Sequence, residues 1–147
     1  MRIFLLQGLH FSQNKLKRLE PESREGLDNL KFFKNAEVID LEDNELESIG
    51  MTEGSEQFWK LFRSTDTLRL SYNRISSIGP CALKPLVSLT SLDLASNRLE
   101  ELPECLSILS GEFLYIFNDH SHVKPQKSWT QFSLLMLLYY YLFFMVF

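Results

Sequence analysis

The chain has 147 residues, enough for one domain of ordinary size. Its net charge is −4, from 15 basic and 19 acidic residues, and this mild acidity argues against nucleic-acid binding, which needs a basic stripe to neutralise phosphates. Its two cysteines and the lack of a CxxC pair exclude the disulfide framework of small secreted domains and a zinc ribbon.

One pattern recurs along the chain in the frame LxxLxLxxNxLxxL. Its asparagines, separated by 30, 29 and 24 residues, are Asn14, Asn44, Asn73 and Asn97. In chain order the four copies read Leu6, Leu9, Phe11, Asn14, Leu16, Leu19; Ala36, Ile39, Leu41, Asn44, Leu46, Ile49; Thr65, Leu68, Leu70, Asn73, Ile75, Ile78; and Leu89, Leu92, Leu94, Asn97, Leu99, Leu102. We predict a fifth, degenerate copy at Leu114, Ile116 and Asp119, where Asp replaces Asn.

Each position of the frame has a physical role. The LxL pair alternates along a short strand and points both apolar side chains into the core. The asparagine stands where the chain leaves the strand, so its amide can satisfy backbone groups of the turn, and stacked asparagines form a ladder. A leucine-rich helical protein is the alternative, but helical periodicity does not require asparagines in register with five apolar positions. The fold class is therefore α/β, a short solenoid of repeats that stabilise one another.

The segment LRLSYNRISSIGPCALKPLVSLTSLDLASNRLEELP, within residues 65–106, resembles the leucine-rich repeat family in its typical 24-residue subtype. That subtype is similar to the repeats of Toll-like receptors, chaoptin-like adhesion proteins and small proteoglycans. The resemblance implies parallel strands on a concave side, an irregular or helical convex side, and recognition or adhesion rather than catalysis. Residues 50–64 lengthen one turn, no cysteine-rich cap or glycosylation sequon is present, and the array begins almost at Met1. We therefore expect a partial array.

The residues that flank the strand leucines are predicted to face the concave side, where they are free to specify a protein partner. They form three columns: His10, Asp40, Arg69 and Asp93; Ser12, Glu42, Ser71 and Ala95; and Gln13, Asp43, Tyr72 and Ser96. The predicted binding residues are His10, Asp40, Glu42, Asp43, Arg69, Ser71, Tyr72 and Asp93. We interpret them as a small acidic patch with an Arg/Tyr pair at its edge, and the alternative is an ordinary solvated face.

Cys81 and Cys105 lie one repeat apart, 24 residues, which places them in one column on adjacent coils. Coils at the strand spacing of ~4.8 Å are within disulfide reach, and two buried, reduced thiols are the alternative. Trp59 is predicted to pack into the convex core with its aromatic neighbours. The run 119–122, Asp-His-Ser-His, reads as a loop rather than a metal site. With no catalytic motif present, we expect neither enzymatic activity nor a cofactor.

The last charged residue is Lys127, and residues 129–147 form an apolar tail of 19 residues without a charge. That length is close to the ~20 residues that span a bilayer. We therefore divide the chain into repeats at 3–119, a linker at 120–128 and a candidate transmembrane helix at 129–147. Lys124 and Lys127 would place the repeats in the cytosol. A tail that replaces further repeats, and an apolar helix that caps the solenoid, are the alternatives.

The predicted function is recognition of another protein through the concave face, within a membrane-associated receptor or adhesion protein. A cytosolic regulatory scaffold of the same fold and a truncated product without function are the alternatives. No nucleic acid is expected as a partner, and membrane contact is expected only through residues 129–147. The predicted localisation is membrane-associated, with the cytoplasm as the alternative.

Overall fold

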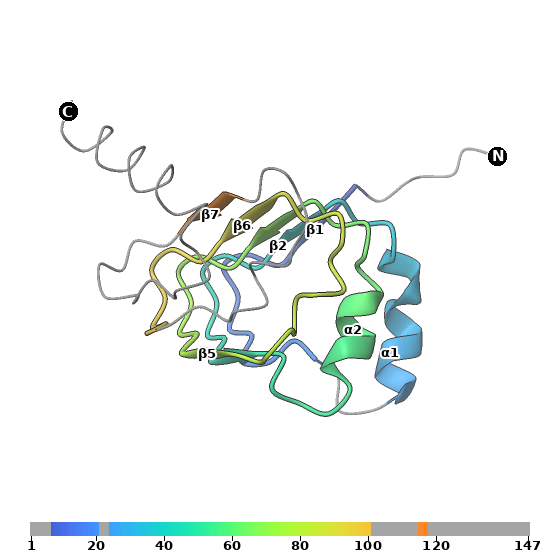
Figure 1. Cartoon of the computed structure of the whole chain (residues 1–147), viewed down its shortest axis with the longest axis horizontal. Helices are drawn as coiled ribbons and strands as arrows, with labels where there is room; N and C mark the ends of the chain where they lie inside the picture. The colour runs from blue at the N-terminus through green and yellow to red at the C-terminus, as the bar shows by residue number, and fades with distance from the viewer. Residues whose placement is uncertain (1–6, 21–23, 101–114, 118–147) are drawn as a thin grey trace.

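The computed structural model describes residues 7–20, 24–100 and 115–117, in which five short strands lie side by side in one parallel sheet (Figure 1). The strands, in their order across the sheet, are β1 Gly8–His10, β2 Val38–Asp40, β4 Thr67–Arg69, β6 Ser91–Asp93 and β7 Tyr115–Phe117. Neighbouring parallel strands need a crossover, and each crossover here is one repeat. The predicted solenoid of parallel strands is therefore confirmed for these residues.

The register of the sheet aligns equivalent positions of the repeats. Leu9, Ile39, Leu68 and Leu92 face one another along the sheet and are buried. The next residue in this row is Ile116, which pairs with Leu92. The predicted fifth copy was therefore wrong in its register, because it aligned Leu114 rather than Ile116 with Leu92. The spacing from Leu92 to Ile116 keeps the 24-residue period, whereas an alignment on Asp119 shortened it to 22.

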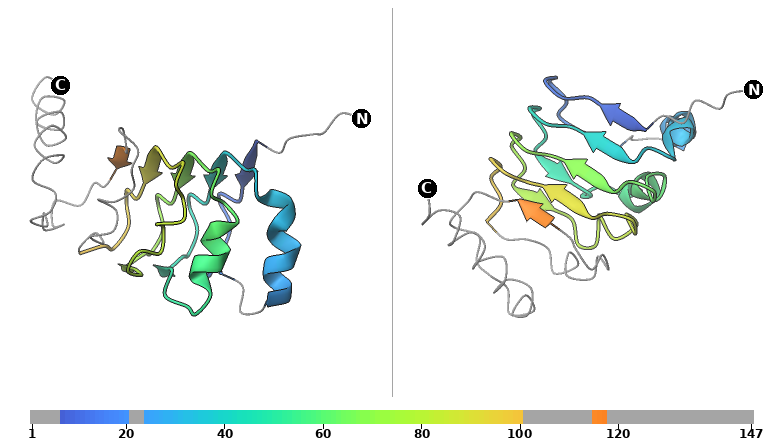
Figure 2. Two further views of the ribbon diagram at one scale, coloured as in Figure 1. Left: turned by 45° about the vertical axis from the view of Figure 1, so that its right-hand side comes forward. Right: turned by 90° about the horizontal axis from the view of Figure 1, so that it is seen from above.

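A second, two-stranded sheet lies at the opposite end of the coils from the five-stranded sheet (Figure 2). It pairs β3 Ser48–Ile49 with β5 Ser77–Ile78 in parallel. These strands contain the last apolar position of the frame in the second and third repeats. Leu46, Ile49 and Ile75 are fully buried, so later apolar residues of the second and third repeats form part of the core.

The longer repeats carry helices on the flank of the coils that leads into the strands of the five-stranded sheet (Figure 2). The 30-residue spacing contains α1 Arg24–Leu30 followed by the short 3-10 helix η1 Lys31–Phe33, and the 29-residue spacing contains α2 Ser55–Lys60. The 24-residue spacing has only turns there. Part of the segment 50–64 thus forms α2, whose side chains Phe58 and Trp59 pack edge to face with ring centroids 5.0 Å apart. Both are buried, together with Phe62, which confirms the predicted aromatic packing.

The first coil of the described stack is less well covered than the others. Phe11 is 44% exposed, whereas the equivalent Leu41, Leu70 and Leu94 are 3% exposed or less. The reason is that this coil has a described neighbour on one side only. An apolar cavity of about 210 Å³ opens beside Phe11 and reaches Trp59.

The predicted membrane helix at 129–147 and the linker at 120–128 lie outside the described residues, so membrane association stays a prediction. Within the ranges that the structure describes, no helix is both long enough and apolar enough to cross a bilayer.

Candidate functional site

The first predicted column lies on the solvent side of the five-stranded sheet. The register places His10, Asp40, Arg69 and Asp93 in one row across the strands. Each follows a buried strand residue, and because strand side chains alternate between faces, these four point away from the core. The structure therefore brings together four predicted residues that are distant in the sequence. We call this row, with Tyr72 and Asp43, the sheet face.

Asp40 is the organising residue of the sheet face. Its Oδ2 lies 3.5 Å from an Arg69 guanidinium nitrogen and 3.8 Å from His10 Nδ1. Its Oδ1 accepts a hydrogen bond of 3.2 Å from the backbone N–H of Glu42. These neighbours leave Asp40 only 8% exposed, although it belongs to the predicted acidic patch. Asp40 thus pairs with Arg69 and does not present its charge alone.

Asp93 repeats part of this arrangement in a later coil. Its Oδ1 accepts a 3.0 Å hydrogen bond from the backbone N–H of Ala95, two residues on, as Asp40 accepts from Glu42. Asp side chains commonly satisfy a backbone N–H two residues ahead at turns. The aspartates of the first column therefore stabilise the chain where it leaves the strand.

The third predicted column lies at the turn, not on the strand. Gln13, Asp43, Tyr72 and Ser96 all have left-handed backbone, with φ between 53° and 56°. Non-glycine residues adopt this region rarely, and here every repeat does so at the residue before its asparagine. Tyr72 is 60% exposed, and its N–H donates to the Ala95 carbonyl at 3.0 Å. The repeated turn thus fixes the backbone that carries the exposed Tyr72 ring.

The asparagines after these turns join neighbouring coils. Asn73 Nδ2 donates to the carbonyl of Leu41 in the preceding coil at 2.9 Å and to its own coil at Leu70, 3.0 Å, while its Oδ1 accepts from Leu46 N at 3.0 Å. Asn44 and Asn97 repeat the same bonds with their preceding coils. Within the described residues, Asn14 bonds only to carbonyls of its own coil, and it is exposed. The ladder therefore runs through three coil junctions of the described stack.

The second column is less accessible than predicted. Ser71 is 2% exposed, and Glu42 and Ala95 are partly buried. The Ser71 carbonyl accepts hydrogen bonds from the backbone N–H of Asp43 and from Asn73 Nδ2, so this position is enclosed between coils. Ser71 is therefore not part of the surface that a partner can touch.

One column of the same face was missed by the sequence reasoning. The register aligns Gly8, Val38, Thr67 and Ser91, each two residues before the first column. Residues two apart on a strand share a face, so the alternation could have identified them. All four are partly buried, and they extend the sheet face toward the start of the strands.

The sheet face combines acidic groups with basic ones. The carboxylate of Asp40 is matched by Arg69 and lies near His10. The exposed groups of the sheet face are therefore of mixed kind: the His10 ring, the Arg69 guanidinium, the Tyr72 ring and the Asp43 carboxylate. The arrangement can offer one bidentate cation, one aromatic surface and one acid within two coils. Across the three described ranges, no cluster of His, Cys, Asp and Glu could hold a metal ion.

Cys81 lies in the turn after β5, is partly buried and has left-handed backbone with φ of 58°. It is disulfide-bonded. The chain has one other cysteine, Cys105, which lies outside the described residues. We therefore expect Cys105 to be its partner.

This pairing gives a direct prediction. The full chain, purified without reductant, should take up no iodoacetamide, and non-reducing proteolysis should release one linked fragment that contains both cysteines. Cys105→Ser is the matched variant, and it should expose one alkylatable thiol at Cys81. Intact-mass and peptide mass spectrometry measure both results. Alkylation of Cys81 in the unmodified chain would contradict the pairing.

Comparison with known proteins agrees with this geometry. The family model described as leucine-rich repeats (2 copies) matches residues 66–107. Podocan of Mus musculus is 33% identical over 129 residues, which are 86% of this chain and 19% of podocan. Leucine-rich repeats and immunoglobulin-like domains protein 3 of Homo sapiens is 32% identical over 108 residues, 74% of this chain and 9% of that protein. The chain thus spans about a fifth and about a tenth of these relatives.

Proposed function

Because this chain belongs to the leucine-rich repeat family, we propose that it binds another protein through the sheet face. Repeat solenoids of this kind typically present extended surfaces for binding rather than catalytic sites. The predicted receptor or adhesion protein and the predicted cytosolic scaffold would both use the same face. The partner is a folded or extended polypeptide in either case.

The exposed pair Arg69 and Tyr72 carries this proposal. Both belong to the repeat of β4, the middle strand of the five, and central Arg and Tyr side chains are frequent anchors of protein interfaces. The Arg69 guanidinium is oriented by Asp40, and the Tyr72 backbone is set by the left-handed turn. A guanidinium and a backbone that are positioned before binding lose less conformational entropy when the complex forms.

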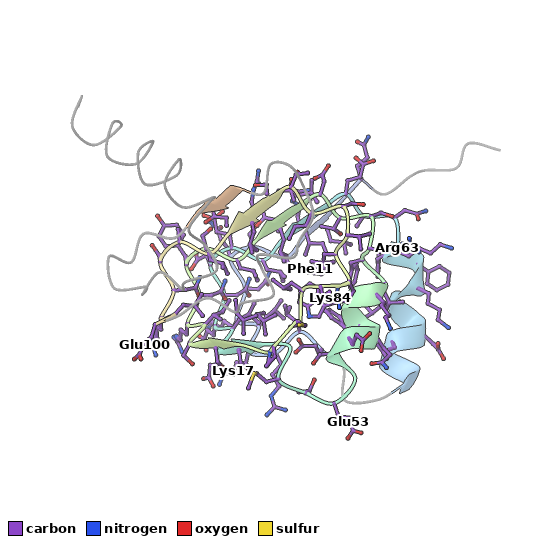
Figure 3. The ribbon with its side chains drawn as sticks, in the orientation of Figure 1. Phe11, Lys17, Glu53, Arg63, Lys84 and Glu100 are labelled. Atoms are coloured by element: carbon purple, nitrogen blue, oxygen red, sulfur yellow. The ribbon has the colours of Figure 1, made fainter. Side chains whose placement is uncertain are left out.

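The experiment first locates the contact and then measures it. The full chain with p-benzoylphenylalanine in place of Tyr72 is expected to cross-link a protein from cells that express the chain. The same photoreactive group in place of Lys17 should not capture that protein, because Lys17 lies at the opposite end of the coil from the five-stranded sheet (Figure 3).

With the captured protein purified, Arg69→Ala and Tyr72→Ala should each weaken its affinity by about 30-fold, the scale of an interface anchor. Lys17→Ala is the control and should change the affinity less than ~twofold. Titration calorimetry gives these values. Equal cross-linking from position 17, or unchanged affinity in both sheet-face variants, would refute the proposal.

A further inference from the structure

A second candidate binding surface lies away from the sheet face, beside α2. A groove of about 870 Å³ runs between α2 with its preceding loop and the chain after β5. Its walls include Glu56, Lys60 and Arg63 on one side and Lys84 and Val87 on the other. No part of the sheet face contributes to it.

Close backbone packing shapes one end of this groove. Gly50 has left-handed backbone with φ of 69°, and a Cβ added there would lie 2.0 Å from the Cβ of Ala82. Gly79 N donates a 2.7 Å hydrogen bond to the Ile49 carbonyl. The inserted loop and the following coil are thus held together, and the groove opens where they diverge toward α2.

The groove is basic although the chain is acidic overall. Lys60 Nζ lies 2.7 Å from the Glu56 carboxylate one helical turn away, so these two charges offset each other. The pKa of Glu56 is lowered first by the hydrogen bond and charge of Lys60 and also by the charge of Lys84. Arg63 and Lys84 form no ion pair with any residue in the described ranges. Two cations are therefore left to face a ligand, beside α2 (Figure 3).

Apolar atoms accompany these cations. Val87 is 60% exposed, and Pro80 and Pro85 line the same groove. A sulfated polysaccharide is recognised by a dense row of basic side chains, whereas this groove combines two available cations with an apolar strip. That combination fits a polypeptide with acidic and aliphatic side chains in extended conformation.

We propose that this groove is a second binding site, which takes an acidic, leucine-containing peptide segment of a partner protein. A carboxylate of the segment pairs with Lys84 and another with Arg63, and an aliphatic side chain packs on Val87. The solenoid then binds proteins on two faces, and the groove does not depend on Arg69 or Tyr72.

The test is fluorescence anisotropy with the full chain and the labelled peptide Gly-Glu-Leu-Glu-Pro-Glu-Leu-Glu-Gly. Saturable binding is expected, and Lys84→Glu should weaken it about tenfold, because an attractive charge pair becomes a repulsive one. Lys84→Gln should weaken peptide binding about threefold. This neutral variant replaces Lys84→Glu as the test if the charge reversal impairs folding. Lys17→Glu makes the same charge change outside the groove and should have little effect.

Three results would overturn the proposal. The first is no saturable binding of this peptide, or equal binding of a peptide in which lysine replaces every glutamate. The second is an equal loss of affinity in the Lys17→Glu and Lys84→Glu variants. The third is tighter binding of a heparin octasaccharide with the same dependence on Lys84, which would make the site a glycan site.

Discussion

Asn73→Ala is expected to lower the free energy of unfolding by about 3 kcal/mol or more, because it leaves several buried backbone groups without partners. Asn73 is 7% exposed. Its amide donates to the carbonyls of Leu41, Leu70 and Ser71, and its Oδ1 accepts from Leu46 N. Alanine offers none of these bonds, and water cannot reach the interior of the coil to replace them. Urea denaturation followed by circular dichroism measures the loss.

Asn14→Ala is the matched control for this prediction. Asn14 occupies the same position of the frame but is exposed, and among the residues that the structure describes it bonds only to Phe11 and Ser12 of its own coil. Water can replace these bonds, so the expected loss is below about 1 kcal/mol. If both variants lost the same stability, the inter-coil bonds of Asn73 would not be the source of its effect.

The strand positions could be predicted because one physical signal dominates them. Apolar residues with a period of two, followed by an asparagine, have a single low-energy arrangement in a stack of coils. Leu68 and Leu92 are accordingly buried and paired across the sheet, and Asn73 is buried at the turn. The register of the fifth copy failed because the asparagine is missing there. Without it, the choice between Leu114 and Ile116 depends on pairing with Leu92 across the sheet, which the local sequence does not contain.

The candidate site was less predictable because accessibility depends on neighbouring coils. Nothing in the local sequence distinguishes Ser71 from an exposed turn serine, yet it is 2% exposed. Asp40 looked like an acidic contact, but the Arg69 in register with it 29 residues later turns it into a positioning group. The left-handed residue before each asparagine was also not anticipated. The sequence pattern predicted which residues form each column. The strand register determines which of them are exposed and which pair with a neighbour.

The placement of residues 50–64, which line part of the groove, could not be predicted from the sequence either. Residues 50–64 appeared in the sequence as an insertion that breaks the repeat. In the structure they bind back to the first coil, because Glu20 Oε1 accepts from Gly50 N at 2.6 Å and from Trp59 Nε1 at 3.3 Å. Gly50 in turn touches Gly79 of the next coil. The insertion therefore connects three coils, and its placement depends on a glycine pair that no motif marks.

Gly79→Ala is expected to lower the free energy of unfolding by about 2–3 kcal/mol, because the added methyl group meets backbone rather than a flexible side chain. Its Cβ would lie 2.0 Å from the Gly50 carbonyl oxygen and 2.8 Å from its carbonyl carbon. Relief requires the two coils to separate, which would also strain the 2.7 Å bond from Gly79 N to the Ile49 carbonyl.

The control for this substitution is Ser76→Ala, an exposed position just before β5 whose hydroxyl makes only a 3.4 Å contact with the Glu47 carbonyl. Its expected cost is within about 0.5 kcal/mol, and urea denaturation compares the two variants under the same conditions. If Gly79→Ala were as stable as Ser76→Ala, the coils would not be in close contact at this point. If the predicted loss is found together with weaker binding of the acidic peptide, the same glycine contact both joins the coils and shapes the groove.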